Sequence, residues 1–285
     1  MKKLKILLTG GQGMLGRTLT AELTDFEVIP TSLPEGDITN ASKFDRLLKQ
    51  HKPDAVIHCA AMTAVDRCET ERELAFKLNA AGTGNVAAAC QRRRCRLIAI
   101  STDYVFDGLI DRAYHEFDRA SGGVTVYGQS KFAGEELVRE LCPDHIIARI
   151  SWLYGAGGPS FVHTMIKLAD ENRPELKVVA DQIGNPTSTL AVARALREIL
   201  RHPELAGTFH LTCEGECSWY EFAQEIFRQS GVTQQVVPCT TAEFPRPAQR
   251  PGNSRLDKMM LRLHNLPPMP HWRNALEEFL KLEGG

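Results

Sequence analysis

Residues 9–16 read Thr-Gly-Gly-Gln-Gly-Met-Leu-Gly, and they follow the apolar run Ile6–Leu8 directly. A glycine-rich turn that leaves a buried strand and opens a helix is the context in which such a motif binds a dinucleotide. Gly10 allows a tight turn, Gly13 lets a pyrophosphate approach the backbone, and Gly16 lets helix and strand pack closely. The first amides of the helix would then face the phosphates. This stretch therefore predicts the first strand, turn and helix of a dinucleotide-binding sheet.

The same alternation of strand and helix continues through the first half of the chain. Further apolar, strand-like runs lie at Val28–Pro30, Ala55–Cys59, Leu97–Ser101 and Ile146–Ile150. Helical stretches separate them, at about 14–23, 41–50, 69–92 and 127–141. Continuous apolar strands between helices predict a parallel sheet covered on both faces. Residues 1–150 are therefore expected to form a doubly wound α/β domain of the Rossmann type.

The second half alternates strands and helices less regularly. The pattern predicts helices near 160–170, 188–201, 218–230 and 271–282, strands near 177–180 and 208–212, and a proline-rich loop at 244–253. Ser218 has the side chain and the position of a helix cap. We expect residues 151–285 to form mostly a smaller substrate-binding lobe, with returns to the main sheet near 181–212.

Composition narrows the class of protein. The 285 residues carry a formal net charge of −1, so no overall field favours nucleic acid or an anionic membrane. No run approaches 18 apolar residues, which predicts no membrane span. The eight cysteines include no Cys-x-x-Cys pair and the nine histidines show no ligand spacing. These features favour a cytoplasmic protein with reduced thiols and no assigned metal site.

The second strand bears on which nicotinamide cofactor is used. It ends near Val28–Ser32 without an acidic residue to hold a ribose 2′-hydroxyl. Asp37 comes after a loop, where it would accept from an adenine amine or cap the helix that begins near residue 41. Because no carboxylate repels a 2′-phosphate there, and Arg17 could pair with one, the sequence favours NADPH over NADH, with NADH as the alternative.

Tyr127 and Lys131 are spaced i, i+4, which places both on one face of a helix. A phenol with a pKa near 10 transfers protons poorly at neutral pH, and a neighbouring ammonium is expected to lower that pKa. Thr102 ends an apolar strand, at the sheet edge where ligands bind. Its hydroxyl would donate to a substrate carbonyl or, alternatively, cap a local turn. The three residues together indicate hydride transfer between a nicotinamide and a carbonyl or alcohol carbon.

His58 and the residues after it end another buried strand. The backbone that follows this strand is expected to face the cofactor, while His58 itself is expected to be a packed histidine rather than a catalyst. From the turn and these strand ends, the expected cofactor contacts are Gly10, Gly13, Met14, Leu15, Gly16, Arg17, Asp37, Cys59, Ala60, Ala61 and Thr63, with Tyr127 and Lys131.

Several blocks together resemble the dTDP-4-dehydrorhamnose reductase family of extended short-chain dehydrogenase/reductases. They are Ser-Thr-Asp-Tyr-Val-Phe-Asp-Gly at 101–108, Tyr-Gly-x-Ser-Lys at 127–131, Ser-Trp-Leu-Tyr-Gly at 151–155, Val-Val-Ala-Asp-Gln-Ile-Gly-x-Pro-Thr at 178–187, Cys-Ser-Trp-Tyr-Glu-Phe-Ala at 217–223 and Arg-Pro at 250–251. The resemblance runs from residue 5 to about 280. Two departures are Ile150, where related reductases usually have Thr, and Asn185, where Ser is common.

The resemblance implies reduction of the 4-keto group of dTDP-4-dehydro-β-L-rhamnose to dTDP-L-rhamnose, the last step of that sugar nucleotide's synthesis. It implies Tyr127 as proton donor, Lys131 as its partner and Thr102 as the carbonyl-binding hydroxyl. It adds Ile38 to the cofactor contacts and implies sugar-nucleotide contacts at Thr102, Asp103, Trp152 and Arg250.

Other functions stay open at this point. One is another sugar-nucleotide reductase or epimerase of the same architecture, and a second is a non-catalytic NADP-binding regulatory subunit. The intact Thr102, Tyr127 and Lys131 argue against the second. Some members of the family use Mg²⁺ at a dimer contact built from glutamates. Those positions find no match in this sequence, so the Mg²⁺ requirement and the choice between monomer and homodimer both stay open.

Overall fold

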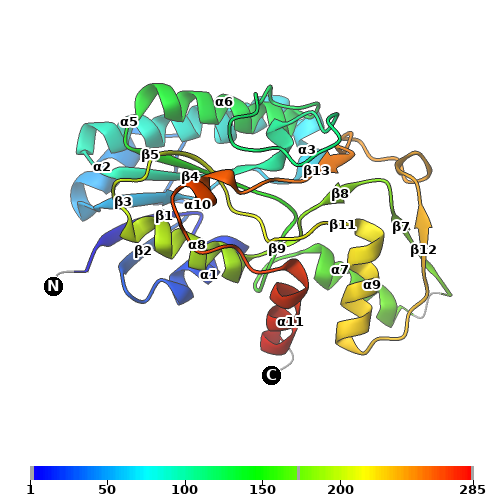
Figure 1. Cartoon of the computed structure of the whole chain (residues 1–285). Helices are drawn as coiled ribbons and strands as arrows, with labels where there is room; N and C mark the ends of the chain where they lie inside the picture. Colours follow the sequence, from blue (N-terminus) through cyan, green and yellow to red (C-terminus); the bar gives the residue numbers. More distant parts are fainter. Residues whose placement is uncertain (1–2, 172–173, 284–285) are drawn as a thin grey trace.

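The computed structural model describes residues 3–171 and 174–283, and a six-stranded parallel sheet is its central layer. The spatial order of the strands is β10-β5-β4-β3-β1-β2 (Figure 1). Their bounds are β1 (Lys5–Thr9), β2 (Glu27–Thr31), β3 (Ala55–His58), β4 (Arg96–Thr102), β5 (His145–Ile150) and β10 (Gly207–His210). The strands run parallel, and the chain adds them toward one edge of the sheet from β1 to β2 and toward the other edge from β3 onward. A crevice at their carboxyl ends is where such sheets bind ligands.

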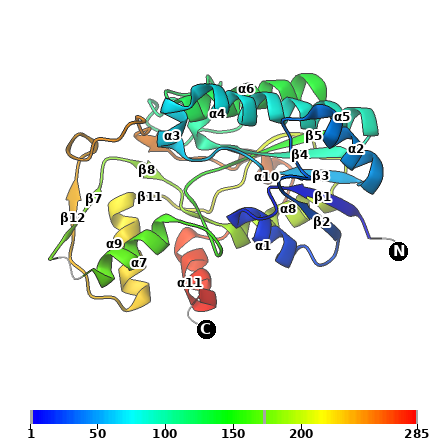
Figure 2. The same ribbon diagram turned by 180° about the vertical axis from the view of Figure 1, so that it is seen from behind.

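Helices cover both faces of this sheet. α2 (Ala41–His51), α5 (Thr83–Arg93) and α6 (Val126–Leu141) lie on one face, and α1 (Met14–Glu22) and α8 (Thr189–Arg201) lie on the other (Figures 1 and 2). Within β1, Leu7 packs into the first helical layer, while Ile6 and Leu8 pack into the core of the second. Strands buried on both faces explain the continuous apolar runs. The prediction of a doubly wound α/β fold is confirmed.

One predicted helix, at 69–92, is in fact broken. The structure has α3 (Val65–Thr70), α4 (Arg72–Phe76), the π-helical turn η1 (Lys77–Gly82) and then α5. The wider turn buries Asn79, whose amide bonds to a neighbouring loop. Single π-helical turns often mark functional sites. Helical periodicity indicated the helix but not this interruption.

The second lobe lies beside the sheet and shares one apolar core with the α1 and α8 layer. α9 (Trp219–Ser230) begins with a capping box between Ser218 and Glu221, so the predicted cap is confirmed. The remaining elements are β6 (Leu153–Tyr154), α7 (Phe161–Asp170), β7 (Leu176–Val179), β8 (Ile183–Gly184), β9 (Thr187–Ser188), β11 (Cys217–Ser218), β12 (Val236–Cys239), β13 (Asn253–Ser254), α10 (Met259–Leu263) and α11 (Trp272–Glu283), with short 3-10 turns η2 (Asp103–Val105) and η3 (Thr241–Glu243).

The path of the chain between the two parts is not a single crossing. After β5 the chain enters the lobe, then returns so that α8 packs against α1 and β10 pairs with β5. It enters the lobe again at β11. No helix within residues 3–171 and 174–283 has both the length and the apolar run needed to cross a membrane.

Candidate active site

The glycine turn is fixed by close contacts within the chain. Gly10 has φ +69°, and a Cβ atom there would lie 2.8 Å from the Ala60 amide nitrogen. A Cβ atom on Gly16 would lie 2.2 Å from the Gly10 carbonyl oxygen. Side chains are therefore excluded at both positions, which brings the turn after β1 against the turn after β3. Gly13 is the N-terminal cap of α1 and adopts an extended conformation.

The N-terminus of α1 is suited to an anion. Gly13 offers no side chain to cap it, and no acidic residue stands in its first turn. The amides of Met14, Leu15 and Gly16 stand in the first turn of the helix, where the partial positive charge of the helix dipole meets no competing carboxylate. This cradle, which a side chain would fill, fits the pyrophosphate of a dinucleotide.

Arg17 extends from the same helix toward the end of β2. Its Nε atom donates to the Gln12 carbonyl at 2.8 Å. Its side chain lines a cavity of about 720 Å³ together with Thr31, Ser32 and Glu35. As the sequence indicated, β2 ends without an acid, at Thr31. The exposed Glu35 carboxylate lies farther along the loop.

Asp37 and Ile38 are tied into local structure. Asp37 accepts hydrogen bonds from the amide and hydroxyl of Thr39 at 2.9 and 2.7 Å, and these bonds lower the pKa of its carboxyl. The cap of α2 is Asn40, so the alternative role of Asp37 as that cap is wrong. The Ile38 side chain is buried under α5, and its carbonyl accepts from Asn85 at 2.9 Å.

The turn after β3 is held by polar side chains beneath it. The Thr9 hydroxyl accepts from the Ala60 amide at 3.3 Å and contacts His58 Nδ1 at 2.8 Å. His58 also contacts the Thr83 hydroxyl at 3.0 Å, and burial lowers its pKa to about 3. The expectation that His58 is a packed histidine is confirmed. Burial likewise raises the pKa of Cys59 to about 12, so its thiol stays protonated.

Asn79 positions the loop that follows this turn, and the motif analysis missed it. Its side chain accepts from the Met62 amide at 2.8 Å and donates to the Met62 carbonyl at 3.0 Å. It also donates to Ser130, on the same helix as Tyr127 and Lys131, at 3.0 Å. Ala61, which is half-buried, and Thr63, which is exposed, flank Met62 in this loop. A lone asparagine within an apolar helical pattern was the available signal.

The structure brings Thr102, Tyr127 and Lys131 together at the carboxyl end of β4. Lys131 is buried, and its Nζ donates to the Ile100 carbonyl on β4 at 2.8 Å. Burial lowers the pKa of Lys131 to about 8. Burial raises the pKa of Tyr127, with the adjacent Thr102 hydroxyl acting in the opposite direction. Because burial is the larger effect, the phenol of the chain alone stays protonated at neutral pH. The lowering of its pKa by the lysine ammonium stays a prediction.

Asp103 follows Thr102 directly and is 4% exposed. The Thr102 hydroxyl donates to its Oδ1 atom at 2.9 Å. The Thr102 oxygen also accepts from the Tyr104 amide at 3.3 Å, as in the predicted alternative of a turn cap. Burial raises the pKa of the Asp103 carboxyl to about 6.

A buried ion pair lies one helical turn beyond Lys131. Glu135 on α6 accepts two hydrogen bonds from Arg149 on β5, at 2.9 and 2.7 Å, and both side chains are 2% exposed. The Glu135 carboxylate also acts to raise the pKa of Lys131 against its burial. The pair was not predicted from the sequence. A single arginine inside the apolar run Ile146–Ile150 was the signal for it.

A cavity of about 1010 Å³ extends from this site into the second lobe. Tyr104, Asp66 and Arg250 line one end, and Phe161, Trp219 and Leu176 are among the residues lining the other. Arg250 pairs with Asp66 at 3.1 Å, so its guanidinium faces the cavity against a carboxylate. Among the residues that the structure describes, Trp219 lines this cavity, and Trp152, the expected contact of the sugar, does not. Trp152 lies behind it, with φ +46° and its ring stacked on Trp219 at 3.5 Å between centroids.

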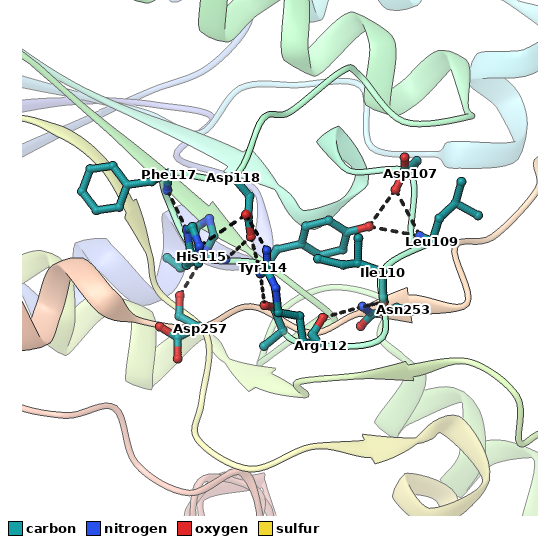
Figure 3. Close-up of polar contacts among 12 residues, drawn as sticks. Asp107, Leu109, Ile110, Arg112, Tyr114, His115, Phe117, Asp118, Asn253 and Asp257 are labelled. Carbon is teal, nitrogen blue, oxygen red and sulfur yellow. Dashed lines mark hydrogen bonds and ion pairs between the residues drawn. The ribbon is translucent and has the colours of Figure 1, made fainter.

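The segment that carries Arg250 is anchored to the loop between Thr102 and Tyr127 (Figure 3). Asn253 donates to the carbonyls of Ile110 and Arg112 at 2.6 and 2.8 Å. Tyr114 stiffens that loop by donating to Asp107 at 2.7 Å. The loop therefore connects the catalytic strand end with the strand that follows Arg250.

No group of three or more His, Cys, Asp or Glu side chains in the described ranges, 3–171 and 174–283, is arranged to hold a metal ion. The carboxylates Glu135 and Asp66 of the site are paired with Arg149 and Arg250.

Comparison with known proteins adds relatives that share nearly the whole chain. Residues 4–283 match the family model described as RmlD substrate binding domain. A dTDP-4-dehydrorhamnose reductase of Streptomyces griseus is 43% identical, over 95% of this chain and 91% of its own. The structure is similar to a dTDP-4-dehydrorhamnose reductase from Clostridium acetobutylicum, with TM-score 0.96 and 45% identity over 99% of this chain and 100% of that one. It is also similar to one from Bacillus anthracis in complex with NADP, with TM-score 0.96 and 42% identity over 99% and 100%.

Proposed function

The chain belongs to the family of the RmlD substrate binding domain, and on this premise we propose that it reduces dTDP-4-dehydro-β-L-rhamnose to dTDP-L-rhamnose with NADPH. It is an NAD(P)H-dependent oxidoreductase, like the reductases that it matches over nearly its whole length. The observation that carries the proposal is the meeting of Thr102, Tyr127 and Lys131 at the end of β4. A cavity of about 1010 Å³ lies next to them, lined by Tyr104, whose ring contacts that of Tyr127.

A bound dihydronicotinamide would supply the hydride to the sugar's carbonyl carbon. Tyr127 donates its phenolic proton to the carbonyl oxygen as negative charge develops there. The Lys131 ammonium, held by the Ile100 carbonyl, stabilises the phenolate that remains, which then regains a proton from water. Glu135 helps to keep that lysine charged despite its burial. The amides at the start of α1 would hold the pyrophosphate.

The test of this function is a substrate comparison. NADPH oxidation would be followed with dTDP-4-dehydrorhamnose and with GDP- and UDP-linked 4-keto sugars. Preference for the dTDP sugar supports the proposal, and equal rates with all three would point to another sugar-nucleotide enzyme. Cofactor that stays bound through purification and is never exchanged would favour an epimerase. No oxidation with any sugar would favour the regulatory subunit.

We expect NADPH to support reduction at least as well as NADH, because β2 ends without an acid and Arg17 lines the adjoining cavity. Arg17→Ala should lower kcat/KM for NADPH by on the order of tenfold, as for loss of one hydrogen bond to a charged group, and change NADH little. Arg228→Ala, on the exposed side of α9, is the control. A wild-type kcat/KM more than tenfold higher with NADH would contradict the prediction.

We also expect Arg250 and Trp152 to affect different kinetic constants. The diphosphate would replace Asp66 as the partner of Arg250, a contact present in ground and transition states alike. Arg250→Ala should therefore raise KM by roughly tenfold or more with little change in kcat. Trp152→Ala should also lower kcat, because it removes the ring that stacks on Trp219 in the cavity wall, and a more loosely held sugar ring samples fewer reactive geometries.

Arg246→Ala is the matched control for the arginine, since Arg246 lines the same cavity from the same loop and stacks on Phe244 rather than pairing with an acid. Steady-state kinetics and thermal unfolding would be measured for all three variants. Changes in stability alone, with KM and kcat untouched, would place Trp152 in the core and Arg250 on the surface.

A further inference from the structure

The Thr102 hydroxyl has a single proton, and in the structure that proton is directed to Asp103. The hydroxyl donates to Asp103 Oδ1 at 2.9 Å, and its oxygen accepts from the Tyr104 amide at 3.3 Å. The Tyr127 phenol faces the same oxygen. While Asp103 is ionised, Thr102 can accept from a neighbour but has no proton left to donate to a carbonyl oxygen.

The surroundings of Asp103 disfavour its charge. The side chain is buried, and its Oδ2 atom has no partner within hydrogen-bond geometry among the residues that the structure describes, although the nearby Ser254 hydroxyl acts to lower the pKa of the carboxyl. No cation pairs with it in that part of the chain. The groups that face it are Tyr104 on η2, Tyr127 on α6 and Ser254 on β13. Asp66 and Arg250, the other charged groups that act on Tyr104, are paired with each other.

We propose that Asp103 is a positioning residue whose protonation reverses the Thr102 hydroxyl and makes it a donor to the substrate carbonyl. A protonated carboxyl donates to the Thr102 oxygen and frees the Thr102 proton to turn toward the ligand. The carbonyl oxygen then receives hydrogen bonds from both Thr102 and Tyr127 as it becomes negative. The inference rests on the proposed reduction.

Burial raises the pKa of Asp103 to about 6, so its protonated fraction grows as pH falls through that value. Lys131 titrates separately, since burial lowers its pKa only to about 8. The range from about pH 5 to 7 therefore separates the titration of Asp103 from that of Lys131. Hydride transfer should become faster across this range as the solution is acidified.

The experiment is single-turnover reduction by the intact protein preloaded with NADPH, across that pH range. Wild-type hydride transfer is expected to accelerate by up to roughly tenfold between pH 7 and 5, because the protonated fraction of a group with a pKa of about 6 rises by that factor. Asp103→Asn should lose this pH dependence and remain near the fast limit, because its amide donates to Thr102 at every pH. A pH dependence retained in Asp103→Asn, or a variant uniformly slow at all pH values, would overturn the inference.

Glu116→Gln is the matched control. Glu116 is another half-buried carboxyl with a raised pKa, and its Oε1 accepts from the His210 and Met260 amides at 3.1 and 3.2 Å, contacts that glutamine can keep. This variant should retain the wild-type pH dependence. Loss of that dependence in Glu116→Gln would show that Glu116, and not Asp103, is the acid whose titration controls the rate.

A second measurement needs no substrate. Carboxyl ¹³C NMR of aspartate-labelled protein should show one resonance that titrates between pH 5 and 7, that is absent in Asp103→Asn, and that titrates at higher pH in Thr102→Val. The valine removes the hydrogen bond that favours the carboxylate. Absence of such a resonance would contradict the proposed role of Asp103 even if the enzyme reduces its sugar. A wild-type protein that shows the titration but reduces no sugar would instead refute the proposed function.

Discussion

Tyr127→Phe is expected to lower turnover by roughly two to four orders of magnitude while cofactor binding is unchanged. The phenylalanine keeps the buried ring but removes the proton donor from the carbonyl oxygen. Burial of Tyr127 raises the pKa of its phenol, so the wild-type group is fully protonated at neutral pH and ready to donate. Turnover would be measured by NADPH oxidation at saturating substrate, and cofactor affinity by fluorescence titration.

Tyr104→Phe is the control for that experiment. Its ring lies 5.5 Å from the Tyr127 ring in an edge-to-face contact, and it too carries a buried hydroxyl. Removing that hydroxyl should change turnover by less than tenfold, since the Tyr127 phenol, and not that of Tyr104, lies against the Thr102 hydroxyl. Near wild-type turnover in Tyr127→Phe, or equal losses in both variants, would remove Tyr127 from its assigned role.

Glu135→Gln is expected to lower the free energy of unfolding by about 3–5 kcal/mol, because it leaves the Arg149 guanidinium buried without a countercharge. Arg149 reaches Glu135 with two hydrogen bonds, and both side chains are nearly inaccessible to water. Urea unfolding would measure the loss. The double variant Glu135→Gln, Arg149→Met should recover much of it, since no charge then remains to be desolvated.

An exposed pair provides the contrast. Arg201 on α8 pairs with Asp25 and Glu198 at the surface, and Arg201→Ala should cost only about 0–1 kcal/mol. A similar cost for Glu135→Gln would show that water reaches the buried pair.

The loss of stability in Glu135→Gln should also depend on pH. Arg149 holds the pKa of Glu135 down at about 2, although burial acts to raise it. A lowered folded-state pKa adds stability that is fully present above the unfolded value of about 4.3 and is lost as pH falls toward 2. The difference in stability between wild type and Glu135→Gln should therefore narrow on acidification through that window. A difference in stability that stays constant over this pH range would mean that the pKa of Glu135 is not lowered by folding.

The sequence predicted those features that repeat locally or stand at strand ends. The glycine turn and the alternating apolar runs were sufficient for the doubly wound sheet, and the Tyr-Lys spacing placed both residues on α6. Contacts between distant segments were not visible in this way. Asp66 meets Arg250, and Glu135 meets Arg149, only because the folded chain brings separate elements together. The direction of the Thr102 hydroxyl depends on such tertiary surroundings too.

The return of α8 and β10 to the main sheet limits how this chain can be recombined. Residues after β5 build the substrate cavity, but they also supply the sheet's last strand and the helix that packs on α1. A chimera joined at Ile150 would import a foreign edge strand and a foreign helix along with the new cavity. Without β10, the hydrogen-bonding groups of β5 would form an open edge prone to pairing with other chains. Substrate preference in this architecture is thus exchanged by changing cavity residues one at a time, rather than by transplanting a contiguous block.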